Sequence, residues 1–391
     1  MKSVPLVLLR HHVTDVVLLV IFVSVQWIGL RRVLRTRFAP SVAMGRAIYA
    51  LAIFTLCFDL TGFALRFTRT KMLLPTGLVI FLSPATLNWA MFTVFAVAIF
   101  AILGRIPRPE LSFSPARRRV LRTIRAAAVV APTAGFGYGM VIERTNIHLR
   151  EQSITIPGLH PDLDGLRLVQ LTDIHLSPFL SEPDLERAVA MANETKAHLA
   201  LVTGDLISLR GDPLDECIDQ LKNLRADAGI FGCLGNHEVY AQCEDYTTER
   251  GAKVGIRFLR SASQSLRFGN ATLNLAGVDY QPMHSDYLVD TEKMIRPGAF
   301  NVLLSHNPDV FPVAERQGWN FTIAGHTHGG QVNVEILHHD WNIARFFTPY
   351  TMGLYRKNDS SIYVSRGIGT IGVPIRLGSP PEVTLLKLCR I

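Results

Sequence analysis

The chain is poor in cysteine, and this excludes one common class of extracellular fold. It has 391 residues but only five cysteines: Cys57, Cys217, Cys233, Cys243 and Cys389. No two of them form a CxxC pair, and one lies in an apolar run. Disulfide scaffolds are short chains dense in cysteine, so this chain is not one of them. One disulfide between two of these cysteines is still compatible with the sequence.

Acidic residues are almost missing from the first 142 positions. Only Asp15, Asp59 and Glu110 stand there against 17 Lys and Arg, which gives a net charge of +14. The remaining residues carry 23 Lys and Arg and 29 Asp and Glu, a net charge of −6, so the overall +8 comes from the first part. A nucleic-acid-binding protein places its basic patch on the folded domain. We therefore expect no nucleic-acid partner.

The first 142 residues also contain long apolar runs, at residues 13–30, 47–65, 73–103 and 126–142. A helix that crosses a bilayer needs about 20 mostly apolar residues, because no water reaches its backbone there. We predict a multi-span α-helical membrane region of three to four helices at residues 1–142 and a second domain at residues 143–391. The protein would then be an integral protein of the cell inner membrane.

Arginine clusters predict which way this region would face. Five arginines lie between the first and second runs and seven between the third and fourth. Cytoplasmic loops carry an excess of Lys and Arg, so both loops are expected in the cytoplasm and the second domain outside it. If the fourth run does not cross, the large domain faces the cytoplasm instead.

Beyond residue 143, strand-like apolar segments alternate with amphipathic helical ones. The pattern predicts helices at residues 182–196 and 213–225, and strands at residues 144–157, 167–172, 198–203, 229–234, 271–277, 301–304, 321–323, 361–365 and 382–388. This alternation favours an α/β (α+β) domain in which helices cover a central sheet. Ligands of such sheets bind beyond the carboxyl ends of the strands.

Polar side chains follow five of these strands. They are Asp173 and His175, then Asp205, then Asn236 and His237, then His306, and last His326 and His328. A lone histidine is most often a core residue, but here five of the thirteen histidines share this position. Carboxylates, an amide and imidazoles suit a pair of divalent metal ions, and one carboxylate can bridge both. We therefore expect two divalent ions of Mn, Fe, Zn or Ni, which can activate water against a phosphoryl group.

The motifs DxH, GD, GNHE, SH and GHTH stand in this order at Asp173, Gly204, Gly235, Ser305 and Gly325. Their order and spacing resemble the calcineurin-like metallophosphoesterase superfamily from residue 144 to the C-terminus. Residues 365–382 resemble its membrane-associated bacterial branch. The chain departs from the family pattern at Ser208, where many relatives carry an acid. The resemblance implies a β-sandwich flanked by helices.

The resemblance also implies roles for the matching residues. Asp173, His175 and His328 would hold one metal ion, and Asn236, His306 and His326 the other. Asp205 would bridge the two ions. A metal-bridging hydroxide would be the nucleophile, and His237 the general acid that protonates the leaving oxygen.

The reaction implied is metal-dependent hydrolysis of a phosphoester, either a phosphomonoester or a phosphodiester. Residues 341–355 mix aromatic side chains with arginine, which suits a membrane interface as well as a core hairpin. The predicted membrane region and the resemblance to the membrane-associated branch imply a membrane partner and make a phospholipid or lipid-linked substrate a candidate. One alternative is a lipid-linked nucleotide-sugar pyrophosphatase that faces the cytoplasm. Another is a catalytically weak membrane sensor that keeps the fold.

Overall fold

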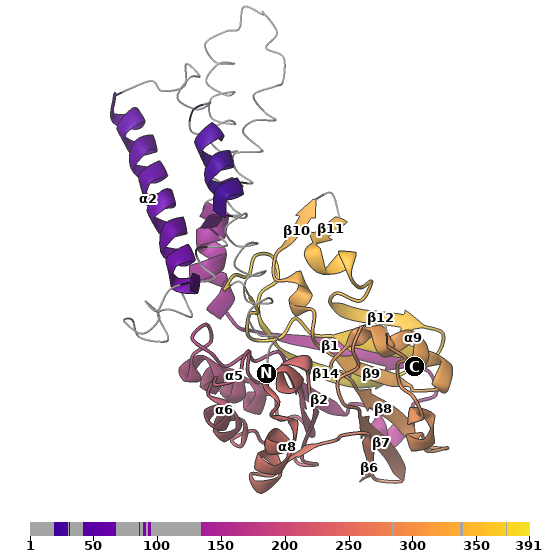
Figure 1. Cartoon of the computed structure of the whole chain (residues 1–391). Coiled ribbons are helices and arrows are strands. Elements are labelled where there is room, and N and C mark those ends of the chain that lie inside the picture. The colour runs from indigo at the N-terminus through magenta and orange to yellow at the C-terminus, as the bar shows by residue number, and fades with distance from the viewer. Residues whose placement is uncertain are drawn as a thin grey trace, which may run out of the picture. The chain divides into compact units, whose positions relative to one another are not determined.

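A computed structural model describes most of the chain in two compact units, residues 1–136 and 137–391 (Figure 1). The described residues are 19–29, 31, 42–67, 86, 89–90, 93–94, 134–283, 285–336, 339–372 and 374–391. In the first unit, residues 19–29 are helical and helix α2 (Val42–Phe67) has 26 residues. The side chain of Gln26 donates to the buried carboxylate of Asp59 at 2.8 Å and to Thr93 Oγ1 at 2.8 Å.

The predicted multi-span membrane region is wrong, and so is the localisation as an integral inner-membrane protein. Within the described residues, no helix combines the length and the apolar character needed to cross a bilayer. Helix α2 includes Arg46, Asp59 and Arg66, and the described helical residues 134–141 are followed by a turn at residue 142. The run at residues 73–103 and the start of the run at residues 126–142 lie mostly outside the described residues. The domain boundary at residues 142 and 143 stays a prediction.

The second unit contains two six-stranded sheets. The first sheet has the order β1-β14-β2-β3-β4-β5, with β1 (His148–Ile156), β14 (Glu382–Arg390), β2 (Arg167–Leu171), β3 (Leu199–Thr203), β4 (Ile230–Cys233) and β5 (Ile256–Phe258). Strands β2 to β5 run parallel, in the register Leu168↔Leu199 and Ala200↔Ile230. The last strand, β14, enters between β1 and β2, antiparallel to β2.

The second sheet has the order β12-β13-β9-β8-β7-β6. Its strands are β12 (Gly353–Lys357), β13 (Ser360–Val364), β9 (Phe321–Ala324), β8 (Phe300–Leu304), β7 (Ala271–Gly277) and β6 (Ala262–Phe268). The four central strands are parallel, and β12 and β6 pair antiparallel at the edges. A separate hairpin joins β10 (Asn333–Ile336) to β11 (His339–Asn342).

Successive side chains of a strand point to opposite faces of its sheet, and this explains how the two sheets pack together. Leu199 and Leu201 of β3 pack into a cluster shared with Val302 and Leu304 of β8, between the sheets. Their neighbours on β3 point to the opposite face, which is covered by α5 (Glu182–Glu194), α6 (Leu214–Leu221) and α8 (Glu244–Lys253). A strand buried on both faces has no polar side, which is why these strands appear as continuous apolar runs in the sequence.

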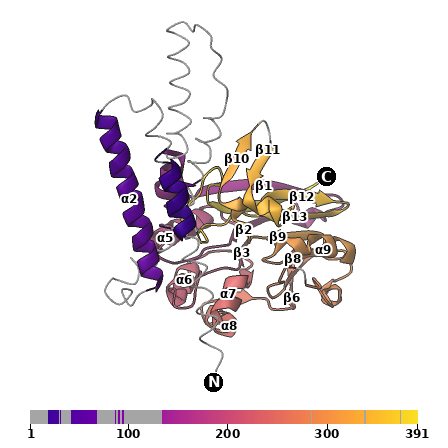
Figure 2. The same cartoon turned by 45° about the horizontal axis from the view of Figure 1, so that its top comes forward.

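Short helices complete the outer layers. Helix α9 (Phe311–Gln317) lies against the second sheet, and α7 (Asn236–Ala241) follows β4. Figures 1 and 2 show α5, α6 and α8 on one side of the unit and α9 on the other. Single 3-10 turns occur at η2 (Glu143–Thr145), η3 (Pro161–Leu163), η4 (Thr291–Met294), η5 (Pro308–Val310), η6 (His328–Gly330) and η7 (Ile343–Phe346). The two sheets agree with the β-sandwich flanked by helices that the family resemblance implies, whereas the alternation of strands and helices alone predicted one central sheet.

Candidate metal centre

Five parallel strands, three from the first sheet and two from the second, end at one polar cluster. Asp173 and His175 follow β2, and Asp205 follows β3. Asn236 and His237 open α7 just after β4, His306 follows β8, and His326 and His328 follow β9. All are buried except His237 and His326, which are partly exposed. Strand ends thus bring the predicted site residues to one place.

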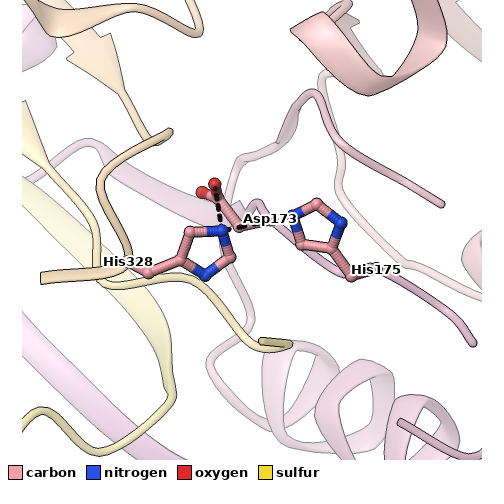
Figure 3. Close-up of side chains that lie close together, drawn as sticks. All are labelled: Asp173, His175 and His328. Atoms are coloured by element: carbon pink, nitrogen blue, oxygen red, sulfur yellow. Dashed lines mark hydrogen bonds and ion pairs between the residues drawn. The ribbon is translucent and has the colours of Figure 1, made fainter. Parts of the chain in front are cut away.

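Asp173, His175 and His328 form the first group of potential ligands, and their side chains point toward one another (Figure 3). His328 Nε2 lies 3.3 Å from Asp173 Oδ1 and 3.2 Å from His175 Nε2. The ligand atoms of all three residues lie within 4.8 Å of one another. Two imidazole nitrogens that face each other at this distance need a proton or a cation between them.

Asp205, His306 and His326 form the second group, again with ligand atoms within 4.8 Å of one another. Asp205 Oδ2 lies 3.0 Å from His306 Nε2 and 3.5 Å from His175 Nε2. The carboxylate of Asp205 therefore faces both groups. Its other oxygen, Oδ1, accepts the backbone N–H of His237 at 2.9 Å.

The backbone is strained at the same residues. Asp173, His175, Asp205, His326 and His328 all have a positive φ, between 49° and 75°. A left-handed non-glycine residue costs about 1–3 kcal/mol and tends to occur at functional sites. In this conformation each strand turns away abruptly at its end, and the ligand side chain points into the cluster.

Glycines let the loops approach each other closely. A Cβ on Gly325 would lie 2.3 Å from Asp173 Oδ2, and one on Gly235 would lie 2.1 Å from Asp205 Oδ1. No other residue fits at either position without displacing a carboxylate. The backbone N–H of His326 donates to both oxygens of Asp173, at 2.9 and 3.1 Å.

In two site histidines, a hydrogen bond from Nδ1 to a backbone carbonyl fixes which ring nitrogen faces the cluster. His306 Nδ1 donates to the carbonyl of Thr203 at 2.7 Å, and His237 Nδ1 donates to the carbonyl of Ser208. Each ring therefore presents Nε2 to the site. His175 Nδ1 contacts Ser208 Oγ at 3.1 Å, so the serine at the position where the family pattern departs still orients a site histidine.

Burial and mutual charge shift the pKa values of the cluster. Burial raises the pKa of Asp173 to about 6. Burial alone would lower the pKa of His306, but the charge of Asp205 outweighs it and raises that pKa to about 10. The same pairing holds the pKa of Asp205 well below its usual range, against the effect of burial. Burial lowers the pKa of His175 to about 3 and that of His326 to about 4. A divalent cation requires neutral imidazoles, so His175 and His326 are ready to bind one at neutral pH, whereas His306 must first lose its proton.

Asn236 provides an independent check on the fit of a metal. Its side-chain Oδ1 is buried and has no hydrogen-bond partner among the described residues. A buried carbonyl oxygen without a partner costs about 1–3 kcal/mol, so such atoms are rare unless an ion or water binds there. The donor set of carboxylate, amide and imidazole matches a borderline divalent ion. The residues present therefore fit a metal centre.

Comparisons with known proteins agree with this chemistry. The model of the calcineurin-like phosphoesterase family matches residues 166–330. An uncharacterized metallophosphoesterase of Aquifex aeolicus (strain VF5) is 30% identical over 241 residues, covering 57% of this chain and 85% of that protein. The chain belongs to the calcineurin-like phosphoesterase family. The resemblance drawn from the sequence motifs is thereby confirmed, and the chain is a metal-dependent hydrolase.

Two further bacterial relatives match this phosphoesterase along most of their length. The phosphodiesterase YaeI of Escherichia coli (strain K12) is 29% identical over 291 residues, covering 70% of this chain and 98% of that protein. The uncharacterized metallophosphoesterase YkuE of Bacillus subtilis (strain 168) is 28% identical over 272 residues, covering 67% and 93%.

Two residues that were not predicted from the sequence support the phosphoesterase site by hydrogen bonds to the backbone of its loops. Glu238 is fully buried, and its carboxylate accepts the N–H groups of Asp205, Leu206 and Gly235 at 2.7–2.9 Å. Its place three residues after Gly235, at the start of a helix, was the available signal. Arg376 is also fully buried and donates to the carbonyl of His328 at 2.9 Å. A single arginine in an irregular segment gave no local signal.

Proposed function

We propose that this phosphoesterase binds two divalent metal ions and hydrolyses phosphodiesters. Asp173, His175 and His328 hold one ion in this proposal, and Asn236, His306 and His326 hold the other. Asp205 would bind both ions. The observation that carries the proposal is the position of Asp205 Oδ2, 3.0 Å from His306 Nε2 and 3.5 Å from His175 Nε2, so that one carboxylate faces both groups. When bound, a pair of divalent ions supplies charge for the phosphoryl oxygens and lowers the pKa of water.

His237 is the proposed general acid. Its Nδ1 is engaged by the carbonyl of Ser208, and its backbone N–H is engaged by Asp205. The ring is therefore held in place with Nε2 free to carry the proton that the leaving oxygen needs. His237 is only partly buried, so a substrate can reach it. Each predicted ligand is present at the cluster, which favours catalysis over a sensor without activity.

The test uses protein stripped of metal and then supplied with manganese or zinc. Hydrolysis of bis(p-nitrophenyl) phosphate should appear only with metal. Asp205→Asn should weaken binding of both ions and lower kcat/KM by at least about 100-fold, because the remaining side chain is neutral. An exposed histidine on β1 provides a matched control, since His148→Ala should change neither metal content nor turnover.

His237→Ala should keep its metal content but lose turnover in proportion to the basicity of the leaving group. The loss should be small for p-nitrophenyl esters, whose leaving group needs little protonation. It should reach about 100-fold or more for an alkyl ester, in the range of general acid catalysis. Equal losses for both esters would remove His237 as the acid, and metal-independent hydrolysis would refute the metal centre.

A further inference from the structure

A cavity of about 190 Å³ opens directly beside the metal centre, and the proposed chemistry does not use it. His326, a site residue, forms part of its wall together with Thr327. The other walls come from the turn after His306 and from η7 with the residues that follow it. An apolar cavity of about 150 Å³ can hold a benzene molecule, so this cavity is large enough for a phenyl ring or a short alkyl chain.

Apart from His326, the polar side chains that line the cavity are already engaged within the protein. Asn307 donates to the carbonyl of Gln281 at 2.7 Å and accepts the N–H of Asp309 at 2.9 Å. Thr327 Oγ1 donates to the carbonyl of Thr351 at 2.5 Å. Thr348 Oγ1 donates to Asp309, and it accepts the N–H of Tyr350 at 3.0 Å. These groups have little hydrogen bonding left to offer a polar ligand.

The remaining wall is apolar and partly exposed. It consists of Met283, Pro308, Ala344 and Phe347. The Phe347 side chain is 66% exposed, although burial of an aromatic side chain is strongly favourable. The backbone N–H groups of Phe347 and Thr348 both bond to the carbonyl of Ala344, at 2.9 and 3.0 Å, which fixes the main chain that carries the ring. An exposed ring at the edge of a cavity gains contacts when an apolar ligand enters.

The charge of Asp309 further restricts the class of ligand that the cavity can bind. Asp309 brings a carboxylate to the cavity wall. A second phosphate or carboxylate in the cavity would be repelled by this group, so the cavity does not suit an anion. His237 is not among the described residues that line the cavity. The group that leaves beside His237 is therefore not the group that enters here.

We infer that the cavity receives the retained ester group of a phosphodiester, and that this group is apolar. The inference rests on the proposed function, because the phosphoryl group must be held at the metal centre. It specifies the substrate class as phosphodiesters that carry an aryl or alkyl alcohol on the side away from His237. Phe347 and Ala344 are the residues that set this preference.

The test compares three p-nitrophenyl phosphodiesters whose second ester group is methyl, phenyl or choline. All three share one leaving group, so only the retained group differs. The manganese-loaded protein should prefer the phenyl ester over the methyl ester by at least about 10-fold in kcat/KM. Phe347→Ala should bring this ratio close to one. Ala344→Phe, which fills the cavity, should also abolish the preference.

The neighbouring phenylalanine is a matched control. Phe346 is 84% exposed and does not line the cavity, so Phe346→Ala should keep the phenyl preference. Equal rates for the methyl and phenyl esters, or a preference that survives Phe347→Ala, would overturn the inference. A preference for choline over phenyl would also overturn it and would indicate a cation site at Asp309. Failure of the proposed function has a different signature, since none of the three esters would then be hydrolysed.

Discussion

Arg376 holds two loops of the metal centre together, and its replacement should destabilise the protein and weaken metal binding. Its guanidinium is completely buried and donates to four carbonyl groups, those of His328, Gly367, Gly369 and Ser379. Nη2 also lies 3.3 Å from His328 Nδ1. Burial lowers the pKa of Arg376 to about 10, and it still stays charged at neutral pH.

The magnitude follows from which carbonyls lose their only donor. The His328 carbonyl also accepts from Ser379 Oγ at 3.1 Å, and the Gly367 carbonyl also accepts from Glu382 N at 3.0 Å. The carbonyls of Gly369 and Ser379 have no second donor within the described part of the chain. Leaving a buried acceptor unpaired costs about 1–3 kcal/mol, so Arg376→Met should lower the free energy of unfolding by about 2–6 kcal/mol.

The assay is urea unfolding of the metal-free protein, followed by calorimetric titration with manganese. Arg376→Lys keeps the charge but offers a single ammonium group, which cannot reach all these carbonyls, so it should recover only part of the loss. Arg316→Met changes an exposed arginine of α9 and should leave both measurements unchanged. A loss below about 1 kcal/mol for Arg376→Met, with unchanged manganese affinity, would refute the reasoning.

Four further predictions concern the predicted ligands and their supports. Gly325→Ala places a Cβ 2.3 Å from Asp173 Oδ2 and should lower manganese affinity and turnover at least about 100-fold, whereas Gly137→Ala, which meets nothing within 4 Å, should lower neither. Because the pKa of His306 is raised to about 10 in the metal-free protein, manganese binding at pH 8 should release its proton, and affinity should increase as the pH rises toward 10; pH-stat titration should show no such release for His306→Gln. The pKa of His306 in the fold lies above its ordinary value of 6.5, so its protonated form stabilises the metal-free protein. Urea unfolding should show this contribution complete below pH 6.5 and lost as the pH rises through about 10. Glu238→Gln turns an acceptor into a donor that faces backbone N–H groups and should lower the free energy of unfolding by about 1–3 kcal/mol in the same urea assay.

The sequence predicts most strands and the positions of the site residues for one physical reason. Strands buried on both faces appear as apolar runs, and polar residues that interrupt such a run mark the end of the strand. The predicted strand at residues 271–277 matches β7, and the one at residues 198–203 differs from β3 by one residue. Short or edge strands such as β5 and β6 were not predicted. Strand β5 has only three residues, and β6 is only partly buried and lacks an apolar run.

The pairing of strands that lie far apart in the sequence could not be predicted from apolar runs. Nothing in residues 382–388 shows that this strand enters between β1 and β2, antiparallel to β2, although that choice sets the order of the first sheet. The apolar runs before residue 142 were interpreted by length and composition alone. The buried contact between Asp59 and Gln26 is a tertiary feature, which a count of apolar residues does not predict.

The two missed supports explain how a strained cluster can persist. Five left-handed residues at about 1–3 kcal/mol each would relax if their loops were free to move. Glu238 holds the loop after β3 and the start of α7 from one side by accepting three backbone N–H groups. Arg376 holds the loop after β9 from the other side by donating to four carbonyls. A buried anion thus satisfies backbone donors and a buried cation satisfies backbone acceptors, which leaves the side chains of the candidate metal centre free to face one another.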